Sequence, residues 1–273
     1  MLLKSLENTP IADIVNAFNQ SFADYELPFQ FTTESMLQKI QFEDIDLRYS
    51  VGAFDNYKLV GFIFFGIDGT TAWDGGTGVI PAYRGQRLTQ RMLDYSFPIL
   101  KAQGINHVLL EVLENNVGAR NIYESAGFRI TRKLHGYKGQ VSIDKTHNYQ
   151  IEVLTDPDFG MLSKLGGFKF AWQQMDKRIQ NRANVITTIC IRDNNEIVAY
   201  MHFDAKASRV HQFGTAESHR RKGMATALFQ YLAQNCATPI LVVNVEDVSE
   251  ADKFIQTTGL AHLISQFEMA MSF

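Results

Sequence analysis

The chain has 273 residues, of which 45% are hydrophobic and 20% are charged, and its formal net charge is -3. This composition is that of a globular protein, the length suits two domains of about 100–150 residues, and the charge argues against a nucleic-acid partner. The two cysteines, Cys190 and Cys236, are too few for a disulfide framework or a CxxC metal site. No apolar run approaches the ~18 residues of a membrane span, so we expect a cytoplasmic protein without membrane contact.

The first part of the chain predicts two helices followed by an antiparallel hairpin. Apolar residues at helical spacing indicate helices over residues 10–23 and 34–40. Strands are predicted over 50–54 and 59–67, and the turn-forming residues 55–58 between them are typical of a hairpin. A further strand is expected from about Gly75 to Ile80.

A basic turn over residues 81–89 follows this strand and leads into an amphipathic helix. Leu88, Met92 and Leu100 mark the apolar face of the helix, and Pro98 is expected to kink or close it. A helix N-terminus presents unpaired N–H groups and the positive end of the helix dipole, so this turn suits a phosphate or pyrophosphate.

Three further elements complete the first half. We predict a buried strand over 108–112, a short helix over 119–125 that Gly127 closes, and a strand over 128–134. A polar, aperiodic segment follows and places the domain boundary there. The predicted domains are therefore residues 1–138 and 149–273, joined by a linker over 139–148.

The second half repeats the first in the same order. Residues 193–198 resemble 55–60, residues 220–225 resemble 84–89, and residues 251–259 resemble 119–127. A repeat of this length indicates domain duplication.

With these motifs, each half resembles the Gcn5-related N-acetyltransferase (GNAT) family. The resemblance implies a mixed α/β (α+β) fold, in which each domain has a mostly antiparallel central sheet flanked by helices. Its phosphate-binding pattern, Arg/Gln-x-x-Gly-x-Gly/Ala, is matched by Arg220, Gly223 and Ala225 in the second half. In the first half only Arg84 matches, because Arg87 and Thr89 replace the small residues.

The resemblance implies acetyl-coenzyme A as co-substrate, bound without a metal. The first-half residues expected to bind it are the strand end and the turn: Val79, Ile80, Arg84, Gly85, Gln86, Arg87, Leu88 and Thr89. Arg87 has two interpretations: it crowds the turn, or its guanidinium swings outward to the phosphates. A capped helix start with solvated charges is the structural alternative for either turn.

A second motif of the family, Asn-x-x-Ala-x-x-x-Tyr-x-x-x-Gly-Phe, is complete in the first half. It begins at Asn116 and includes Tyr123 and Gly127. By resemblance, Tyr123 lies near the coenzyme sulfur and protonates the departing thiolate. Asn116 would hold the pantetheine chain or the helix start. The structural alternative for Tyr123 is a core aromatic with a bonded hydroxyl.

Two acids are candidate general bases. Glu111 lies in a Leu-Glu-Val sequence that the family's protein N-terminal acetyltransferases share, where that Glu serves as base. A structural role within the strand is an equal alternative. Asp74 is the other candidate and is also expected to face the substrate, although an ordinary turn aspartate is an alternative.

Aromatic residues after the first helix are expected to contact the substrate, namely Phe22, Tyr25 and Phe29, with Phe31 nearby. Asp24 and Glu26 among them suit a cationic amine, and an aromatic core with surface acids is the alternative. The histidines have no metal-ligand spacing.

The two halves have complementary defects, because Ile255 and Val248 replace Tyr123 and Asn116 in the second. We therefore predict catalysis in the first half: acetyl transfer to a primary amine by direct attack, with a small-molecule amine or a peptide N-terminus as acceptor. The protein is expected to be a monomer or homodimer. The alternative is a non-catalytic acyl-CoA-binding or regulatory module.

Overall fold

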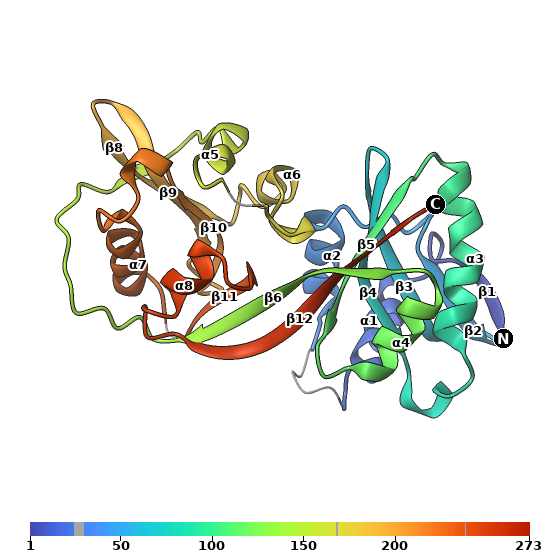
Figure 1. Ribbon diagram of the computed structural model, residues 1–273. Coiled ribbons are helices and arrows are strands. Elements are labelled where there is room, and N and C mark those ends of the chain that lie inside the picture. Colours follow the sequence, from blue (N-terminus) through green and yellow to red (C-terminus); the bar gives the residue numbers. More distant parts are fainter. Residues whose placement is uncertain (25–29, 168, 238) are drawn as a thin grey trace. The chain divides into compact units, whose positions relative to one another are not determined.

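The computed structural model in Figure 1 describes residues 1–24, 30–167, 169–237 and 239–273. The chain forms two compact units. The first contains Met1–Thr131 together with Glu268–Phe273, and the second contains Arg132–Phe267. Each is a mainly antiparallel sheet with helices on its faces, which confirms the predicted fold class. Among the described residues, no helix is long and apolar enough to cross a bilayer.

The sheet of the first unit runs β1-β2-β3-β4-β5, followed by the end of β12. The strands are β1 (Leu2–Ser5), β2 (Val51–Asp55), β3 (Lys58–Asp68), β4 (Thr71–Val79), β5 (His107–Leu113) and β12 (Ala261–Ser272). Strands β1 to β4 pair in antiparallel fashion, and β5 is parallel to β4. The predicted hairpin is confirmed, since Asp55 pairs with Lys58.

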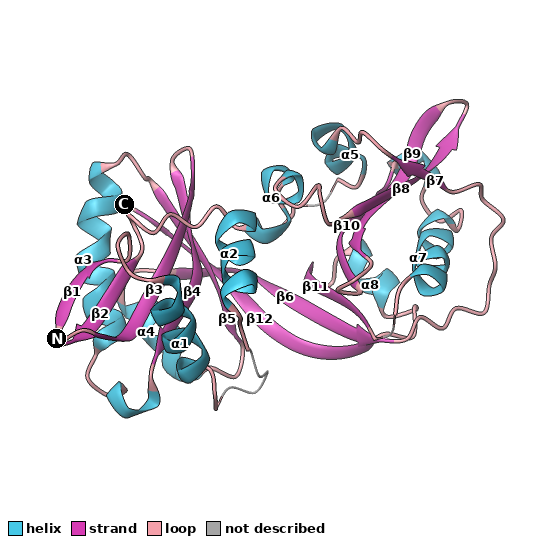
Figure 2. Ribbon diagram, turned by 180° about the vertical axis from the view of Figure 1, so that it is seen from behind, coloured by secondary structure: helices cyan, strands magenta, loops and turns pink. Residues whose placement is uncertain are grey.

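Helices α1 (Ile11–Ser21) and α2 (Thr33–Phe42) cover one face of this sheet, and α3 (Leu88–Ala102) covers the other (Figure 2). The alternation of side chains along β3 explains this: Phe62 and Phe64 pack with Phe18 of α1, whereas Gly61 lies against Met92 of α3. The short helix α4 is Val117–Ser125. Pro98 does not close α3, because the helix continues to Ala102.

The second unit has the strand order β6-β11-β10-β9-β8-β7. These strands are β6 (Arg129–Gly139), β7 (Glu152–Leu154), β8 (Thr187–Asp193), β9 (Glu196–Asp204), β10 (Arg209–Thr215) and β11 (Ile240–Glu246). Its helices are α5 (Phe159–Leu165), α6 (Asp176–Gln180), α7 (Met224–Asn235) and α8 (Glu250–Ile255). Only β10 and β11 are parallel in this series.

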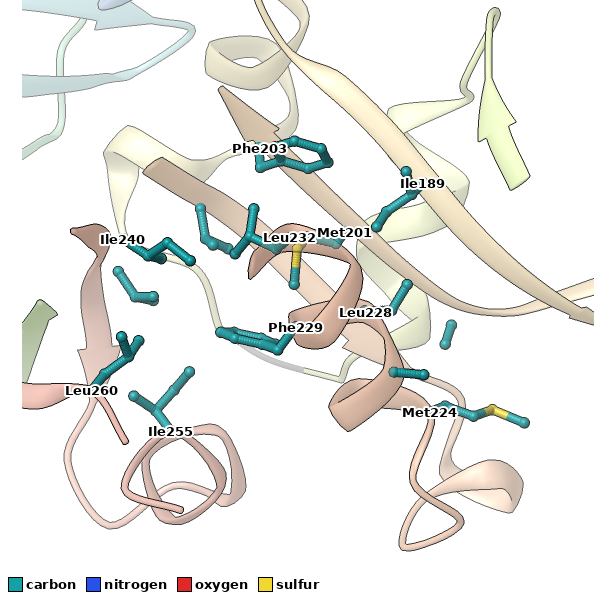
Figure 3. Close-up of a cluster of buried hydrophobic side chains, with 14 of the residues drawn as sticks. Ile189, Met201, Phe203, Met224, Leu228, Phe229, Leu232, Ile240, Ile255 and Leu260 are labelled. Atoms are coloured by element: carbon teal, nitrogen blue, oxygen red, sulfur yellow. The ribbon is translucent and has the colours of Figure 1, made fainter. Parts of the chain in front are cut away.

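The core of the second unit lies between the sheet and α7 (Figure 3). Leu228 and Phe229 of α7 pack with Met201 and Phe203 of β9, and Ile255 of α8 joins them. All are buried. The opposite face of the sheet carries Tyr200 in a smaller cluster with Leu162 of α5.

The compact units differ from the predicted domains because β6 and β12 each have residues in both. Residues 132–139 of β6 belong to the second unit, where Tyr137 pairs with Val242. Glu268–Phe273 belong to the first unit, where the Phe273 N–H donates to the Asn106 carbonyl oxygen over 3.0 Å. A strand pattern in the sequence indicates which residues are extended but not which strand they pair with. The predicted domains, 1–138 and 149–273, are therefore two successive stretches of the chain, whereas the first compact unit also includes Glu268–Phe273.

Candidate active site

A gap between β4 and β5 forms the centre of the first unit's site. The two strands pair in parallel from Thr71 to Trp73, the latter opposite Leu109. Within the described residues the ladder ends there, so residues 74–79 of β4 have β3 as their partner. A bulge at this point places Asp74 opposite Phe65 and Gly76 opposite Phe64. Such a bulge changes the direction in which side chains point, in this case next to the last residues that pair β4 with β5.

The carboxylate of Asp74 lies in this bulge and accepts three hydrogen bonds. The donors are the Gly76 N–H at 2.7 Å, the Thr77 hydroxyl at 2.5 Å and the Tyr123 hydroxyl at 3.4 Å. Burial raises the pKa of Asp74, although these hydrogen bonds and the charge of Lys39 oppose the shift. The bond from Tyr123 is long, and it places a proton acceptor beside the phenol.

Helix α4 brings Tyr123 to Asp74. Asn116 caps the helix by accepting a hydrogen bond from the Ala119 N–H at 3.1 Å, so its side chain holds the helix start. Gly127 follows the helix with φ +104, a conformation that favours glycine. The Tyr123 ring is buried and meets Phe128 edge-on at 5.9 Å between centroids. The motif therefore fixes the ring and leaves its hydroxyl at the gap.

Glu111 lies on β5, two residues beyond Leu109, the last residue that pairs with β4, and is half-buried. On α2, the Lys39 ammonium forms an ion pair with Glu43 at 2.5 Å. The Glu43 carboxylate lies near Gly75 of the bulge. Acidic groups from three elements thus lie around this part of the first unit.

Arg84, the first residue of the phosphate-binding pattern, is bound by the protein itself. Its guanidinium donates to both carboxylate oxygens of Asp24, at 2.6 and 2.9 Å, to the Ser21 carbonyl oxygen and to the Val79 carbonyl oxygen. Three of these bonds connect the turn to the end of α1 and the residues after it, and the fourth connects it to the end of β4. Its partner Asp24 is one of the predicted substrate acids, and the Arg84 guanidinium lowers the Asp24 pKa.

The turn requires two left-handed residues, and they are Gly85 at φ +76 and Arg87 at φ +55. A left-handed conformation costs a residue other than glycine about 1–2 kcal/mol. Gly85 has open space around the position of a side chain, and Arg87 is exposed. Its guanidinium has no hydrogen bond or ion pair with a described residue. Gln86 is exposed as well, whereas Leu88 is buried and Thr89 half-buried.

The strand end before the turn presents one backbone donor to the gap. The Ile80 N–H is already used, since it donates to the Val60 carbonyl oxygen of β3 at 2.9 Å. Backbone groups alternate in direction along a strand. The Val79 N–H is therefore directed away from β3, toward the side on which β5 diverges.

The predicted substrate aromatics are partly in the core. Phe22 packs against Phe18 at 4.6 Å between ring centroids, and Phe31 packs against the same ring at 4.7 Å. Tyr25, Phe29 and Glu26 lie outside the described residues.

The second unit has the same framework with different chemistry. The Arg220 guanidinium donates to the Thr215 carbonyl oxygen at 3.3 Å and to the Gly166 carbonyl oxygen at 2.9 Å, in parallel with Arg84. Its turn also has two left-handed residues, Arg221 at φ +62 and Gly223 at φ +87. Ala225 follows in the first turn of α7.

Apolar residues replace the polar pair of the first unit. Strand β10 carries a bulge like that of β4, and Val210 precedes it as Asp74 does in β4. Ile255 lies four residues before Gly259, as Tyr123 lies four before Gly127. Val210 and Ile255 are both buried in the core. The second unit therefore has no titratable pair at this position.

One polar cluster was not predicted from the sequence. His135 lies 3.1 Å from the Asp247 carboxylate, and ligand atoms of His135, Asp247 and Asp252 lie within 4.8 Å of one another. Asp252 also accepts a hydrogen bond from Tyr137 at 2.5 Å, and burial together with this carboxylate raises the Tyr137 pKa to about 12. No spacing in the sequence indicates this cluster, because the pairing of β6 with β11 brings His135 near Asp247.

Comparison with known proteins agrees with this architecture. Residues 12–128 match the Acetyltransferase (GNAT) family, and residues 165–270 match an Acetyltransferase (GNAT) domain. A tandem GNAT protein from the clavulanic acid biosynthesis pathway has a TM-score of 0.74 at 11% identity, covering 99% of this chain and 98% of its own. A GCN5-related N-acetyltransferase from Sphaerobacter thermophilus has a TM-score of 0.73 at 13% identity, with coverage of 99% and 95%.

Among curated proteins, N-alpha-acetyltransferase 30 of Schizosaccharomyces pombe is 28% identical over 95 residues. The match covers 33% of this chain and 63% of the length of that relative. With the two matched domains and the fold, these similarities show that the chain belongs to the GNAT acetyltransferase family, as a protein with two GNAT domains in tandem.

Proposed function

We propose that the first unit is an acetyl-CoA-dependent N-acetyltransferase that acts on a primary amine. The observation that carries this proposal is the contact between Tyr123 and Asp74 at the strand gap, beside an open basic turn. In the second unit Ile255 and Val210 take these positions, and neither side chain can move a proton.

The residues of the first turn suit the coenzyme. Gly85 leaves open space at the turn, the unpaired guanidinium of Arg87 supplies positive charge, and α3 begins there with its free N–H groups. We therefore favour the interpretation in which Arg87 extends to the phosphates. Arg84 stabilises the turn and does not bind the phosphates, because oxygens of the protein already accept its hydrogen bonds.

Acetyl-CoA would supply the acetyl group and a thiol leaving group. The Val79 N–H on the gap side is the donor that we assign to the thioester carbonyl. Tyr123 is the general acid, and its hydroxyl proton is the one delivered to the leaving group.

Asp74 and Glu111 are the two candidate bases for the amine. The geometry favours Asp74, because its Oδ2 lies next to the Tyr123 hydroxyl and can return a proton to it after each turnover. The raised pKa of Asp74 also makes it a stronger base than an exposed carboxylate. Glu111 lies on the neighbouring strand and remains the second candidate.

A cationic acceptor would suit the carboxylate of Asp74, and Glu111 lies on the neighbouring strand, whereas Glu43 is already paired with Lys39. The similarity to an N-alpha-acetyltransferase supports a peptide N-terminus, and a small-molecule amine is the other acceptor class. We infer a protein of the cytoplasm, monomeric or homodimeric.

The test is release of free thiol from acetyl-CoA in the presence of peptides with different N-termini and of small amines. Amine-dependent release that follows the peptide or amine added supports the proposal. Coenzyme binding without turnover on either set would instead support the non-catalytic acyl-CoA-binding module. Failure to bind coenzyme would overturn both.

A further inference from the structure

Gly223 at the start of α7 is covered by a side chain of the same unit. A Cβ atom built on Gly223 would lie 2.3–2.4 Å from three atoms of the His147 ring. That distance is far shorter than any real contact, so the imidazole rests directly on the backbone of the turn. The need for glycine here therefore has an explanation other than a bound phosphate.

Two further contacts hold the segment Lys145–Tyr149 on this surface. The Tyr149 hydroxyl donates to the Lys222 carbonyl oxygen in the turn at 2.7 Å. The Gln230 side-chain amide on α7 donates to the Lys145 carbonyl oxygen at 2.9 Å. The His147 and Tyr149 rings stack with 6.3 Å between their centroids. The segment is therefore attached before, at and after the ring that covers Gly223.

The positive charge of Arg221 in this turn is also paired within the protein. The Arg221 guanidinium forms an ion pair with Glu250 of α8 at 2.7 Å, and Glu250 contacts Lys253 as well. Arg87 in the first turn has no such partner among the described residues. An anion at the second turn would have to compete with the Glu250 carboxylate.

The strand gap of the second unit is bridged by a side chain. Strands β10 and β11 pair only at Arg209–Leu241 and Val210–Val242. Just beyond, the Gln174 side-chain amide donates to the His211 carbonyl oxygen of β10 at 2.9 Å and to the Val243 carbonyl oxygen of β11 at 3.0 Å. A cavity of about 270 Å³ remains beside Gln174, and it is lined by Arg220 and Glu250 but not by Gly223.

We propose that the turn at Arg220–Ala225 binds the chain's own segment Lys145–Tyr149 in place of coenzyme, with Gln174 bridging the strand gap. The protein then takes one acetyl-CoA per chain, in the first unit. The docked segment covers Gly223 through His147 and bonds to the Lys222 carbonyl oxygen through Tyr149, while Arg220 donates to the Thr215 and Gly166 carbonyl oxygens. The location of that one coenzyme rests on the proposed function, whereas the docking of the segment does not.

Two measurements on the full chain test this. Calorimetric titration with coenzyme A should give one equivalent per chain. Hydrogen exchange followed by mass spectrometry should show coenzyme A slowing exchange over residues 84–90 at least about 5-fold and leaving 220–226 unchanged. In the His147→Ala variant, exchange over 222–226 should be at least about 5-fold faster without coenzyme. His262→Ala, a change of an exposed histidine in the same unit, is the matched control and should not alter it.

Two equivalents of coenzyme A, or protection of 220–226 by it, would overturn the proposal. Unchanged exchange over 222–226 in His147→Ala would overturn the docking of the segment. If His147→Ala fails to fold, Tyr149→Phe removes only the hydroxyl bonded to Lys222 and is measured in the same way. Absence of any coenzyme binding would count against the proposed function, and the exchange of the variants would still decide the docking.

Discussion

The turns at residues 84–89 and 220–225 have the same backbone conformation, but glycine and arginine exchange places between them. Each has two left-handed positions, and each places glycine at one and arginine at the other: Gly85 and Arg87 in the first turn, Arg221 and Gly223 in the second. In both, the leading arginine bonds to the carbonyl oxygen of the preceding strand end. The two turns therefore share a backbone conformation but present different side chains to solvent and to a ligand.

This comparison shows that a matching motif does not by itself indicate a working site. The second turn fits the family pattern better, but His147 covers its glycine and Glu250 neutralises its left-handed arginine. The first turn fits the pattern poorly, but it is open and its Arg87 is unpaired among the described residues. The contact between Tyr123 and Asp74 is found in the same unit as the open turn.

The largest expected effect is on the acid. Tyr123→Phe should lower kcat by about 10²-fold, a usual scale for loss of general acid catalysis, with little change in the Kd of coenzyme A. Steady-state kinetics and calorimetry measure the two quantities. Tyr57→Phe, at a tyrosine that is 98% exposed, is the matched control and should behave as wild type. An unchanged kcat in Tyr123→Phe would remove Tyr123 from the mechanism.

A comparable loss, also of about 10²-fold in kcat, is expected for Asp74→Asn if Asp74 alone serves as the base. If ionised Asp74 is the base, wild-type kcat falls as the pH drops through its raised pKa, which lies above the ordinary value of about 3.9. This acid limb of the pH–rate profile should be absent in Asp74→Asn. If the acid limb persists in Asp74→Asn and is absent in Glu111→Gln, Glu111 is the base. Asp94→Asn, an exposed change on α3, is the control.

The same raised pKa predicts how stability depends on pH. A carboxyl that holds its proton more tightly when folded contributes stability below its unfolded pKa, and loses that contribution as the pH rises through its folded pKa. The free energy of unfolding of wild type should therefore fall relative to Asp74→Asn as the pH rises from about 4. Denaturant titrations of both proteins over this range measure the difference. A rise instead would show that hydrogen bonds to ionised Asp74 outweigh its burial.

The Kd of coenzyme A should distinguish the two turns. Arg87→Gly removes a charge-assisted contact to the phosphates and should weaken binding about 5–10-fold, an effect that shrinks at high salt. Arg221→Gly is the matched change in the second turn and should leave Kd unchanged. Equal or tighter binding by Arg87→Gly would mean that the arginine only crowds the turn.

The smallest expected effect is on stability. Relief of left-handed strain is worth about 1–2 kcal/mol, and the greater chain entropy of unfolded glycine offsets about 0.5–1 kcal/mol of it. Arg87→Gly should therefore stabilise the protein by about 0.5–1 kcal/mol. Arg221→Gly should gain less, because it also loses the ion pair with Glu250. A stability loss in Arg87→Gly would show that the arginine makes contacts worth more than its strain.

The sequence alone determined the duplication, the fold class and the order of most elements, because apolar periodicity and turn residues act locally. It also led to Tyr123 as a candidate acid, since motif spacing around Asn116 and Gly127 is set by one short helix, and it left Asp74 as an alternative to Glu111. Of the two expectations for Pro98, a kink or the end of α3, the end is not observed, because the helix continues to Ala102.

Only the tertiary structure decided which groups meet. It placed the hydroxyl of Tyr123 next to Asp74, 49 residues away in the chain, and paired Arg84 with Asp24. In the tertiary structure, His147 lies on Gly223, and the end of β12 belongs to the first unit. Hydrogen-bond partners and strand neighbours depend on long-range packing, which local sequence patterns do not encode. A turn with the better motif was therefore found covered, and the poorer one open.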